Sequence, residues 1–289
     1  MQIFDKTVRD VLNEKLIKLE DHFSSDVIFY YGDINPAYVK GFRDFIEQIK
    51  SDTKKNNRLT LLLNTFGGSA ETVEKMVEII RFHYEEIYFV VPDYALSAGT
   101  IFCMSGDKIF MDYSSSLGPI DPQVYTGNTY VPALGYLDKV NELIEKSKND
   151  TLTNAEFLIL QNQDLAMLRS YEQARDLTIT LLKEWLVRYK FKNWSTHRTN
   201  PIKKDQIVTE EEKKERAEEI AKLLGDNKIW HSHGRFIGII TLQTLLKLEI
   251  EDYSNKADLR SLIRSYNDLI CEYILRNGIK VFFHSRNFF

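Results

Sequence analysis

Two short apolar runs, each ended by small or turn-forming residues, most constrain the fold of this chain. The first is "LTLLLNT" (Leu59 to Thr65), followed by Gly67-Gly68, and the second is "IYFVV" (Ile87 to Val91), followed by Pro92-Asp93. Between them, residues 69–83 carry apolar side chains at helical spacing. Strand, helix and strand in this order predict a right-handed parallel crossover. We therefore expect an α/β fold whose strands are covered on both faces.

The 289-residue chain is long enough for one large domain or for a domain with an added lobe, and we expect the second. Residues 1–136 are predicted to form the α/β core, opening with an amphipathic helix over residues 1–22. Residues 137–229 change to long, charged, helix-favouring segments, which predict a helical arm. Residues 230–289 are predicted to return to the core and end in a helix with an aromatic tail.

Composition excludes several classes of protein. A net charge of −4 gives no strong positive field, so we expect no binding to nucleic acid. The N-terminus lacks an apolar signal-peptide region and no run approaches about 18 apolar residues, so we expect a cytoplasmic protein without a membrane partner. Cys103 and Cys271 form no CxxC pair, so they predict reduced core thiols and no zinc site.

The turns after the two runs, "NTFGGSAE" and "ALSAGT", hold the candidate catalytic residues. Both should project from the carboxyl edge of a parallel sheet, where such sheets bind ligands. Ser97 begins a helical segment, and its small neighbours leave its hydroxyl open to a substrate. The amides near Gly67, Gly68 and Ala98 could stabilise an oxyanion. By spacing alone, a serine here is more often a helix N-cap, and a Gly-Gly pair is usually only a turn.

Three motifs in order, "LLLNTFGGSAETVEKMVEIIR", "VVPDYALSAGTIFCMSGDKIFMD" and "SSLGPIDPQ", resemble the serine dehydrogenase proteinase family. This family belongs to a larger group with the Clp protease proteolytic subunit, signal peptide peptidase A and the membrane-bound stomatin-cleaving proteases. The resemblance implies a ClpP/crotonase-like spiral core of parallel strands and helices with an appended helical region. It also implies that Ser97 is the nucleophile and that Gly67, Gly68 and Ala98 form the oxyanion hole.

The general base that must activate Ser97 has two candidates. In the Clp subunit a histidine follows the nucleophile, but the matching segment here holds Asp121, which we interpret as shaping a turn. The stomatin-cleaving relatives use a lysine, and Lys139 falls at a similar place. A buried lysine can serve as a base. The second candidate is His233 in "WHSHGRFI", which needs less tuning near neutral pH. We rank Lys139 first, although an exposed lysine on a helix would look the same.

The function predicted from these residues is that of a serine endopeptidase of the ClpP/signal peptide peptidase A type, acting through an acyl-enzyme on Ser97. No cofactor or metal is implied. One alternative is an inactive ClpP-like scaffold or peptide-binding module, because the sequence secures no base. Another is acyl-CoA chemistry of the crotonase type, which needs no nucleophilic serine. The resemblance also suggests a homo-oligomer, with residues 140–225 as a contact surface.

Overall fold

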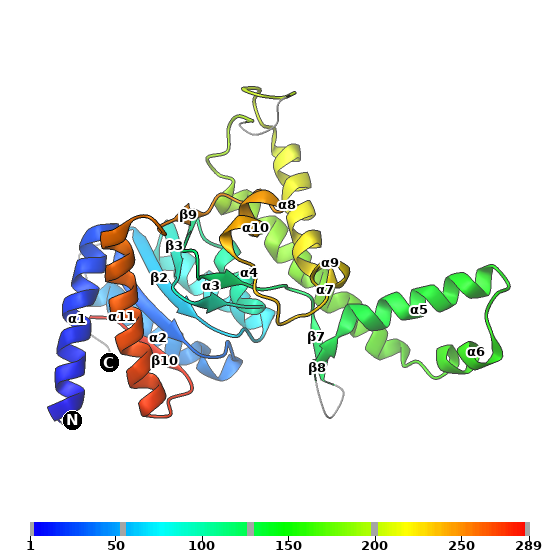
Figure 1. Cartoon of the computed structure of the whole chain (residues 1–289), viewed down its shortest axis with the longest axis horizontal. Helices are drawn as coiled ribbons and strands as arrows, with labels where there is room; N and C mark the ends of the chain where they lie inside the picture. Colours follow the sequence, from blue (N-terminus) through cyan, green and yellow to red (C-terminus); the bar gives the residue numbers. More distant parts are fainter. Residues whose placement is uncertain (1–2, 53–55, 126–129, 198–201, 287–289) are drawn as a thin grey trace.

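A central six-stranded sheet organises the computed structural model, which describes residues 3–52, 56–125, 130–197 and 202–286 (Figure 1). The strand order is β10-β1-β2-β3-β5-β9. The strands from β1 to β9 run parallel, and β10 pairs antiparallel with β1. The predicted α/β class is therefore confirmed. The strands are β1 (Asp26–Tyr31), β2 (Arg58–Asn64), β3 (Glu86–Val91), β5 (Lys108–Met111), β9 (Glu251–Asp252) and β10 (Phe282–His284).

Both faces of the sheet are buried, which explains why its strands read as nearly continuous apolar runs. One face lies under α1 (Ile3–Phe23) and α11 (Ala257–Arg276), where Leu62 of β2 packs with side chains of both helices. Its neighbours Leu61 and Leu63 point to the opposite face and join the larger core. This alternation follows from the two-residue period of a strand.

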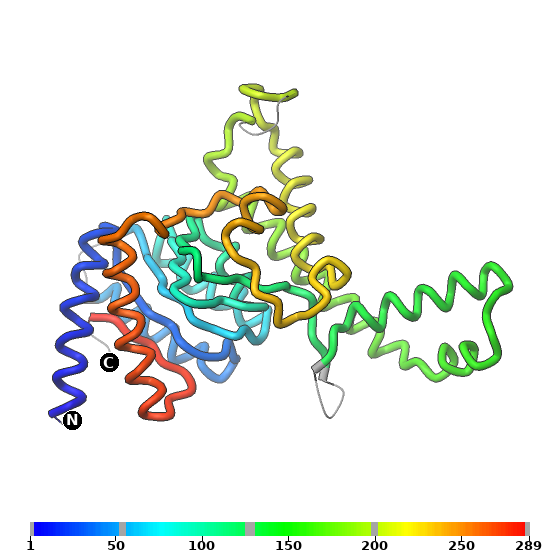
Figure 2. Tube along the Cα trace, in the orientation of Figure 1, coloured from blue at the N-terminus to red at the C-terminus, as the bar shows by residue number. Residues whose placement is uncertain are grey.

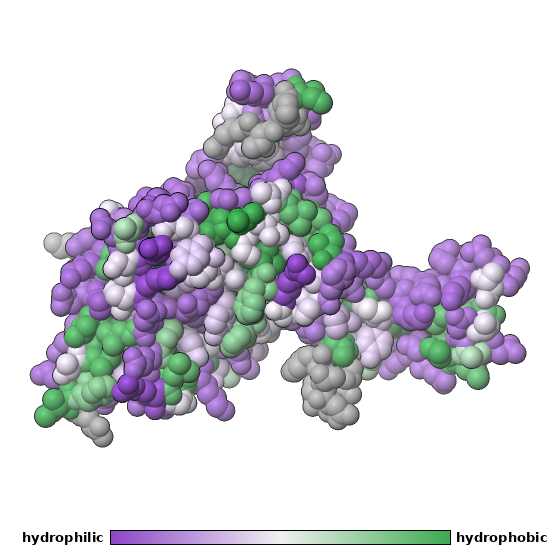
Figure 3. Space-filling model, in the orientation of Figure 1, coloured by the Kyte–Doolittle hydropathy of each residue, from purple (hydrophilic) through white to green (hydrophobic). Residues whose placement is uncertain are grey.

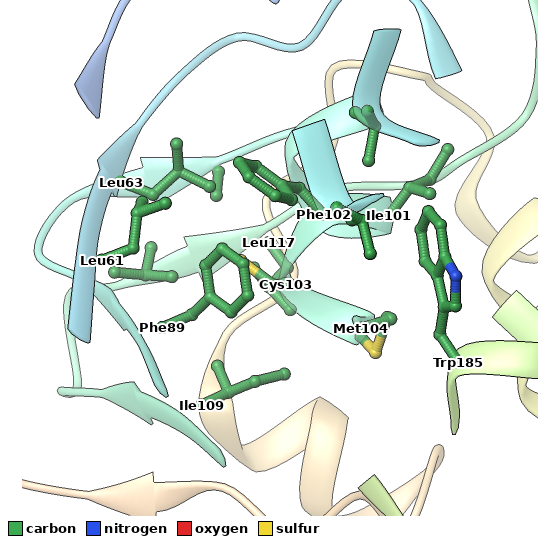
Figure 4. Close-up of a cluster of buried hydrophobic side chains, with 14 of the residues drawn as sticks. Leu61, Leu63, Phe89, Ile101, Phe102, Cys103, Met104, Ile109, Leu117 and Trp185 are labelled. Carbon is green, nitrogen blue, oxygen red and sulfur yellow. The ribbon is translucent and has the colours of Figure 1, made fainter. Parts of the chain in front are cut away.

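The second face is covered by helices from distant parts of the chain. They are α2 (Val39–Asp52), α3 (Ala70–His83), α4 (Ala98–Met104), α7 (Leu165–Trp185) and α8 (Glu210–Gly225). Every residue of α4 is buried. Figure 4 shows Phe102 and Met104 of this helix among Leu61, Phe89 and Trp185. Because the core encloses α4 along its whole length, the turn that precedes it is held in a fixed place.

A helical arm leaves the core after the α/β part (Figure 1). It consists of α5 (Ala133–Lys148), α6 (Asn154–Gln161) and the first part of α7. Asp164 separates α6 from α7 within this helix-favouring segment. Its carboxylate accepts hydrogen bonds from the amides of Ala166 and Met167 and caps the start of α7. Farther along, Trp185 of α7 and Leu224 of α8 lie in the main core. The domain boundaries after residues 136 and 229 stay a prediction.

The tip of the arm exposes apolar side chains, visible as green atoms at its outer end (Figure 3). Within α6 no described residue is buried. The exposed residues near this tip are Phe157, Leu158, Ile159, Leu165 and Met167.

After α8 the chain returns to the core, where β9 and β10 form the two edge strands of the sheet. Figure 2 shows this return, which brings the orange C-terminal helix α11 beside the blue N-terminal helix α1. The aromatic tail, expected only to follow a helix, instead forms β10 on the edge of the sheet. The remaining elements are η1 (Pro36–Tyr38), β4 (Tyr94–Ala95), β6 (Ser116–Leu117), β7 (Gln123–Tyr125), β8 (Tyr130–Pro132), η2 (Leu186–Lys190), α9 (Asn227–Trp230) and α10 (Ile239–Thr244).

None of the helices in the described ranges is both long enough and apolar enough to cross a membrane.

Candidate active site

Ser97 occupies a strained turn between β4 and α4. Its backbone has φ 52° and ψ −118°, in the left-handed range that residues other than glycine seldom adopt. Its side chain makes no capping hydrogen bond to α4, so the N-cap explanation of this serine fails. A strained backbone of this kind costs roughly 1–3 kcal/mol and persists where the surroundings fix it, often at functional sites. Here the buried helix α4 provides that support.

Backbone pairing brings the two predicted turns together. The amide of Thr65, just after β2, donates to the carbonyl of Tyr94 at 3.1 Å, and the amide of Leu96 donates back to Thr65 at 3.0 Å. Gly67 then lies directly against Ser97. A Cβ atom added to Gly67 would be 2.8 Å from the Ser97 Cβ and 2.9 Å from the Leu96 carbonyl. With φ at +117°, Gly67 also has a conformation that favours glycine. The structure thus brings Ser97 and the glycine loop into contact.

Two backbone amides in this contact region are free to bind a ligand. The N–H of Gly67 is not one of them, because it donates to the Thr65 hydroxyl at 3.0 Å. The N–H groups of Gly68 and Ala98 have no hydrogen-bond acceptor in the described part of the chain. Unpaired backbone donors beside a serine hydroxyl have the chemistry that an oxyanion hole requires. Of the three residues predicted for the oxyanion hole, Gly68 and Ala98 have unpaired N–H groups. Gly67 contributes by lacking a side chain, which would clash with Ser97.

Gly68 is held in position by Ile34, which follows β1. The Ile34 amide donates to the Gly67 carbonyl at 2.8 Å, and the Ser69 amide donates to the Ile34 carbonyl at 3.0 Å. A Cβ atom on Gly68 would lie 2.0 Å from that same carbonyl oxygen, so no other residue fits without a shift. Ser69 also caps α3 by accepting from the Thr72 amide at 3.0 Å. The glycine loop is therefore fixed at both ends.

His233 forms a hydrogen-bonded pair with Asp121. The Nδ1 atom of His233 lies 2.8 Å from Oδ1 of Asp121. The Asp121 side chain is only 2% exposed, whereas that of His233 is 24% exposed. Gln123 donates to the other carboxylate oxygen at 2.8 Å. When Nδ1 donates to a carboxylate, the neutral imidazole has Nε2 as its proton acceptor, which is the arrangement of a general base.

Strand-like pairing explains why these two residues meet. Leu117 and Ile237 exchange antiparallel hydrogen bonds of 3.0 and 2.8 Å. Asp121 lies four residues after Leu117, and His233 lies four residues before Ile237. The antiparallel register therefore brings Asp121 and His233 opposite each other. On its other side the same segment pairs with the strand that precedes Ser97, since Ala95 pairs in parallel with Leu117. The segments that carry Ser97, Asp121 and His233 therefore lie side by side.

Lys139 lies on α5 and is mostly solvent-exposed. Its side chain is 56% exposed, and its Nζ atom lies 3.0 Å from both carboxylate oxygens of Glu142. A lysine must lose its proton to act as a base, which burial promotes and a neighbouring carboxylate opposes. The hydroxyl of Ser97 has no hydrogen-bond partner within the described ranges, so neither candidate base contacts it in this structure.

The local sequence around Asp121 predicts only a turn, yet the structure makes this residue the acidic partner of His233. Its burial and its pairing with His233 depend on the register between segments 112 residues apart. No local pattern carries that register. Among the described residues, no three His, Cys, Asp or Glu side chains are grouped in a way that could hold a metal ion.

Comparisons with known proteins place this architecture in a family. The chain matches the family described as ClpP-like SDH-type serine proteinase over residues 43–219. Two uncharacterized proteins of Methanocaldococcus jannaschii are similar to it, one 36% identical over 70 residues and the other 29% identical over 100 residues. The matches cover 24% and 35% of this chain, and 24% and 33% of the relatives, so the chain spans only about a quarter to a third of their length.

Among solved structures, ClpP1 from Listeria monocytogenes is 13% identical with a TM-score of 0.42, covering 77% of this chain and 88% of that one. A lysine-to-alanine mutant of the 1510-N membrane-bound stomatin-specific protease, in complex with a substrate peptide, is 19% identical with a TM-score of 0.34. That match covers 57% of this chain and 73% of the other. The family match covers more than half of the sequence, and the chain belongs to the family of ClpP-like SDH-type serine proteinases.

Proposed function

We propose that this protein is a serine peptidase in which Ser97 attacks a peptide carbonyl. The observation that carries the proposal is the contact between Ser97, in its strained turn, and a glycine loop whose neighbouring amides on Gly68 and Ala98 are unpaired. The attacking oxygen and both oxyanion donors would then act on one carbonyl group. Membership of a serine proteinase family supports the same reaction class.

We assign the general base to His233, oriented by Asp121. Nε2 of His233 accepts the proton of the Ser97 hydroxyl as the Oγ–carbon bond forms. The developing oxyanion accepts hydrogen bonds from Gly68 and Ala98. His233 then donates the proton to the leaving amine as the carbon–nitrogen bond breaks. Water repeats the sequence on the acyl-enzyme, releasing the acid and restoring the hydroxyl.

This mechanism requires the imidazole to come within about 3 Å of the Ser97 hydroxyl when substrate binds. Catalytic hydrogen bonds are often long in a free enzyme and tighten in the complex. The partly exposed side chain of His233 has solvent on one side, which gives it room for such an adjustment. Lys139 is the alternative base, and its ion pair with Glu142 at the surface supports it less well.

The second candidate function is a peptide-binding module without turnover. The observation that favours it is the absence, across the described residues, of a hydrogen bond between the Ser97 hydroxyl and any base. Such a module would bind extended peptides at the same amides but form no acyl-enzyme. Reaction with a fluorophosphonate probe separates the two. The peptidase forms a covalent adduct at Ser97 that the variant Ser97→Ala lacks, and the binding module forms none.

A cytoplasmic location and a homo-oligomeric assembly are also part of the proposal. The exposed apolar residues at the tip of the arm, such as Phe157 and Leu165, support a contact with another copy of the chain. Light scattering tests it: the mass should exceed that of one 33.8 kDa chain. A monomer at micromolar concentration would contradict this part of the proposal.

A further inference from the structure

A pair of stacked aromatic rings, one exposed and one half-buried, lies next to the proposed oxyanion loop. Phe66 immediately precedes Gly67, and its side chain is 62% exposed. Its ring stacks on that of Tyr94, with centroids 4.5 Å apart and planes 29° apart. Pairing between Thr65 and Ala95 sets the two rings on one face, because side chains alternate along paired strands. The pair is preformed, so a ligand that stacks on it would not have to order it first.

A carboxylate accompanies the aromatic pair. Asp93 is exposed and immediately precedes Tyr94. Its Oδ2 atom accepts a hydrogen bond of 2.7 Å from the amide of Asn267, a side chain that is only 2% exposed. The Oδ1 atom of Asn267 in turn accepts from the buried Asn64 at 2.6 Å. Two buried amides therefore fix the position of this exposed carboxylate.

Asp93 forms no ion pair in the described part of the chain, and the hydrogen bond to its side chain comes from the uncharged amide of Asn267. The nearby ring of Tyr94 stays uncharged, because burial first and then the neighbouring Tyr31 raise the pKa of its hydroxyl to about 12. An uncharged aromatic face beside a fixed carboxylate matches the chemistry of a flat or compact organic cation. A purely apolar ligand would use the rings but leave the carboxylate unused.

The position of the Phe66 and Tyr94 rings indicates which ligand would bind to them. A polypeptide whose carbonyl sits between the amides of Gly68 and Ala98 must pass within a residue or two of Phe66. We propose that Phe66, Tyr94 and Asp93 form a subsite for an arginine or lysine side chain of the substrate, close to the bond that is cleaved. This inference rests on the proposed peptidase function and adds a preference for basic residues to it.

The test compares matched quenched peptides that differ only in charge. Each carries one arginine in an otherwise uncharged sequence, moved through six central positions, and each has a counterpart with citrulline, which has the same shape and no charge. At one position the wild-type kcat/KM for arginine should exceed that for citrulline by roughly five-fold, the size expected of a cation–π contact with a nearby carboxylate. In Phe66→Leu and in Asp93→Asn the ratio should fall toward one.

The ratio is taken within each variant, so changes in the chemical step at Ser97 cancel. Phe82→Leu is the matched control, because Phe82 is 85% exposed and lies at the opposite end of α3 from the glycine loop. Its ratio should stay at the wild-type value. A ratio of one at every position, or a ratio that survives Phe66→Leu, overturns the inference while the peptidase function stands.

Failure of the peptidase function itself would look different. In that case the wild-type protein hydrolyses none of the peptides and Ser97 does not react with a fluorophosphonate. The same pairs are then compared as fluorescent ligands by anisotropy, in which hydrolysis plays no part. Tighter binding of the arginine peptide, lost in Phe66→Leu, upholds the subsite, and equal affinities for all pairs overturn it.

Discussion

His233 and Asp121 meet through a 2.8 Å contact between Nδ1 and Oδ1, although 112 residues separate them in the chain. The carboxylate is almost completely buried, and the imidazole is partly open to solvent. The buried carboxylate of Asp121 therefore fixes the orientation of the partly exposed imidazole of His233. The pair lies beside the segment that carries Ser97. The proposed catalytic residues follow the order Ser97, Asp121, His233 along the chain.

If the pair works as a unit, its two members should not contribute independently. Asp121→Asn and His233→Gln should each slow acylation of Ser97 by about 10²–10⁴-fold, because each removes the oriented acceptor. The double variant should be no slower than His233→Gln alone. Rates of fluorophosphonate labelling measure this directly. Additive losses, or an unaffected Asp121→Asn, would show that the contact is only structural.

Lys139→Met separates the two candidate bases. Because Lys139 is exposed and paired with Glu142, we expect this variant to label at a rate within about two-fold of wild type and to lose at most about 0.5 kcal/mol of stability. Labelling kinetics and urea unfolding measure the two quantities. A loss of labelling comparable to that of His233→Gln would instead identify Lys139 as the base.

Gly67→Ala tests the close approach of the glycine loop to Ser97. The new Cβ atom would lie 2.8 Å from that of Ser97, at a backbone φ of +117°. We expect the Ser97 turn to shift and labelling to fall by at least about 10²-fold, since displacements near 1 Å have effects of this size.

The matched control for that variant is Gly135→Ala. Gly135 lies in α5, and an added Cβ atom would meet nothing within 4 Å. This change should leave labelling intact and stabilise the protein by about 0.5–1 kcal/mol. Normal labelling in Gly67→Ala would mean that the two turns do not cooperate.

His284 predicts a dependence of stability on pH. Burial lowers the pKa of this imidazole from 6.5 to about 3, so the folded protein keeps it neutral over a range in which the unfolded chain protonates it. Its contribution to stability is therefore complete above about pH 6.5 and is lost as the pH falls toward 3. Between these values the loss approaches about 1.4 kcal/mol per pH unit.

Urea unfolding of wild type and His284→Gln at pH 4, 5 and 6 measures this contribution. The variant should show a shallower fall in the free energy of unfolding, whatever its absolute stability. Parallel curves for the two proteins would show that His284 titrates normally in the fold.

The sequence predicted what depends on local pattern. The apolar runs of β2 and β3, the helix between them and the small residues around Ser97 are all contiguous features, so the glycine loop and the turn that holds Ser97 could be placed at one sheet edge. The pairing of Asp121 with His233 could not be predicted, because it depends on the bridge between Leu117 and Ile237.

The end of the chain shows the same limit. Residues 282–284 look like an aromatic tail, yet they pair with Phe29, Tyr30 and Tyr31 as an edge strand. Three residues are too few for a strand pattern to stand out from the sequence. What fixes them is the apolar surface that they cover, including the ring of Phe283 against Phe45.

The most direct test of the account is the site of covalent reaction with a fluorophosphonate. Intact-mass analysis followed by peptide mapping should find one adduct per chain, on Ser97, with none in Ser97→Ala and a strongly reduced rate in His233→Gln. An unmodified wild-type chain after prolonged reaction, or an adduct on a different residue, would contradict the proposed role of Ser97.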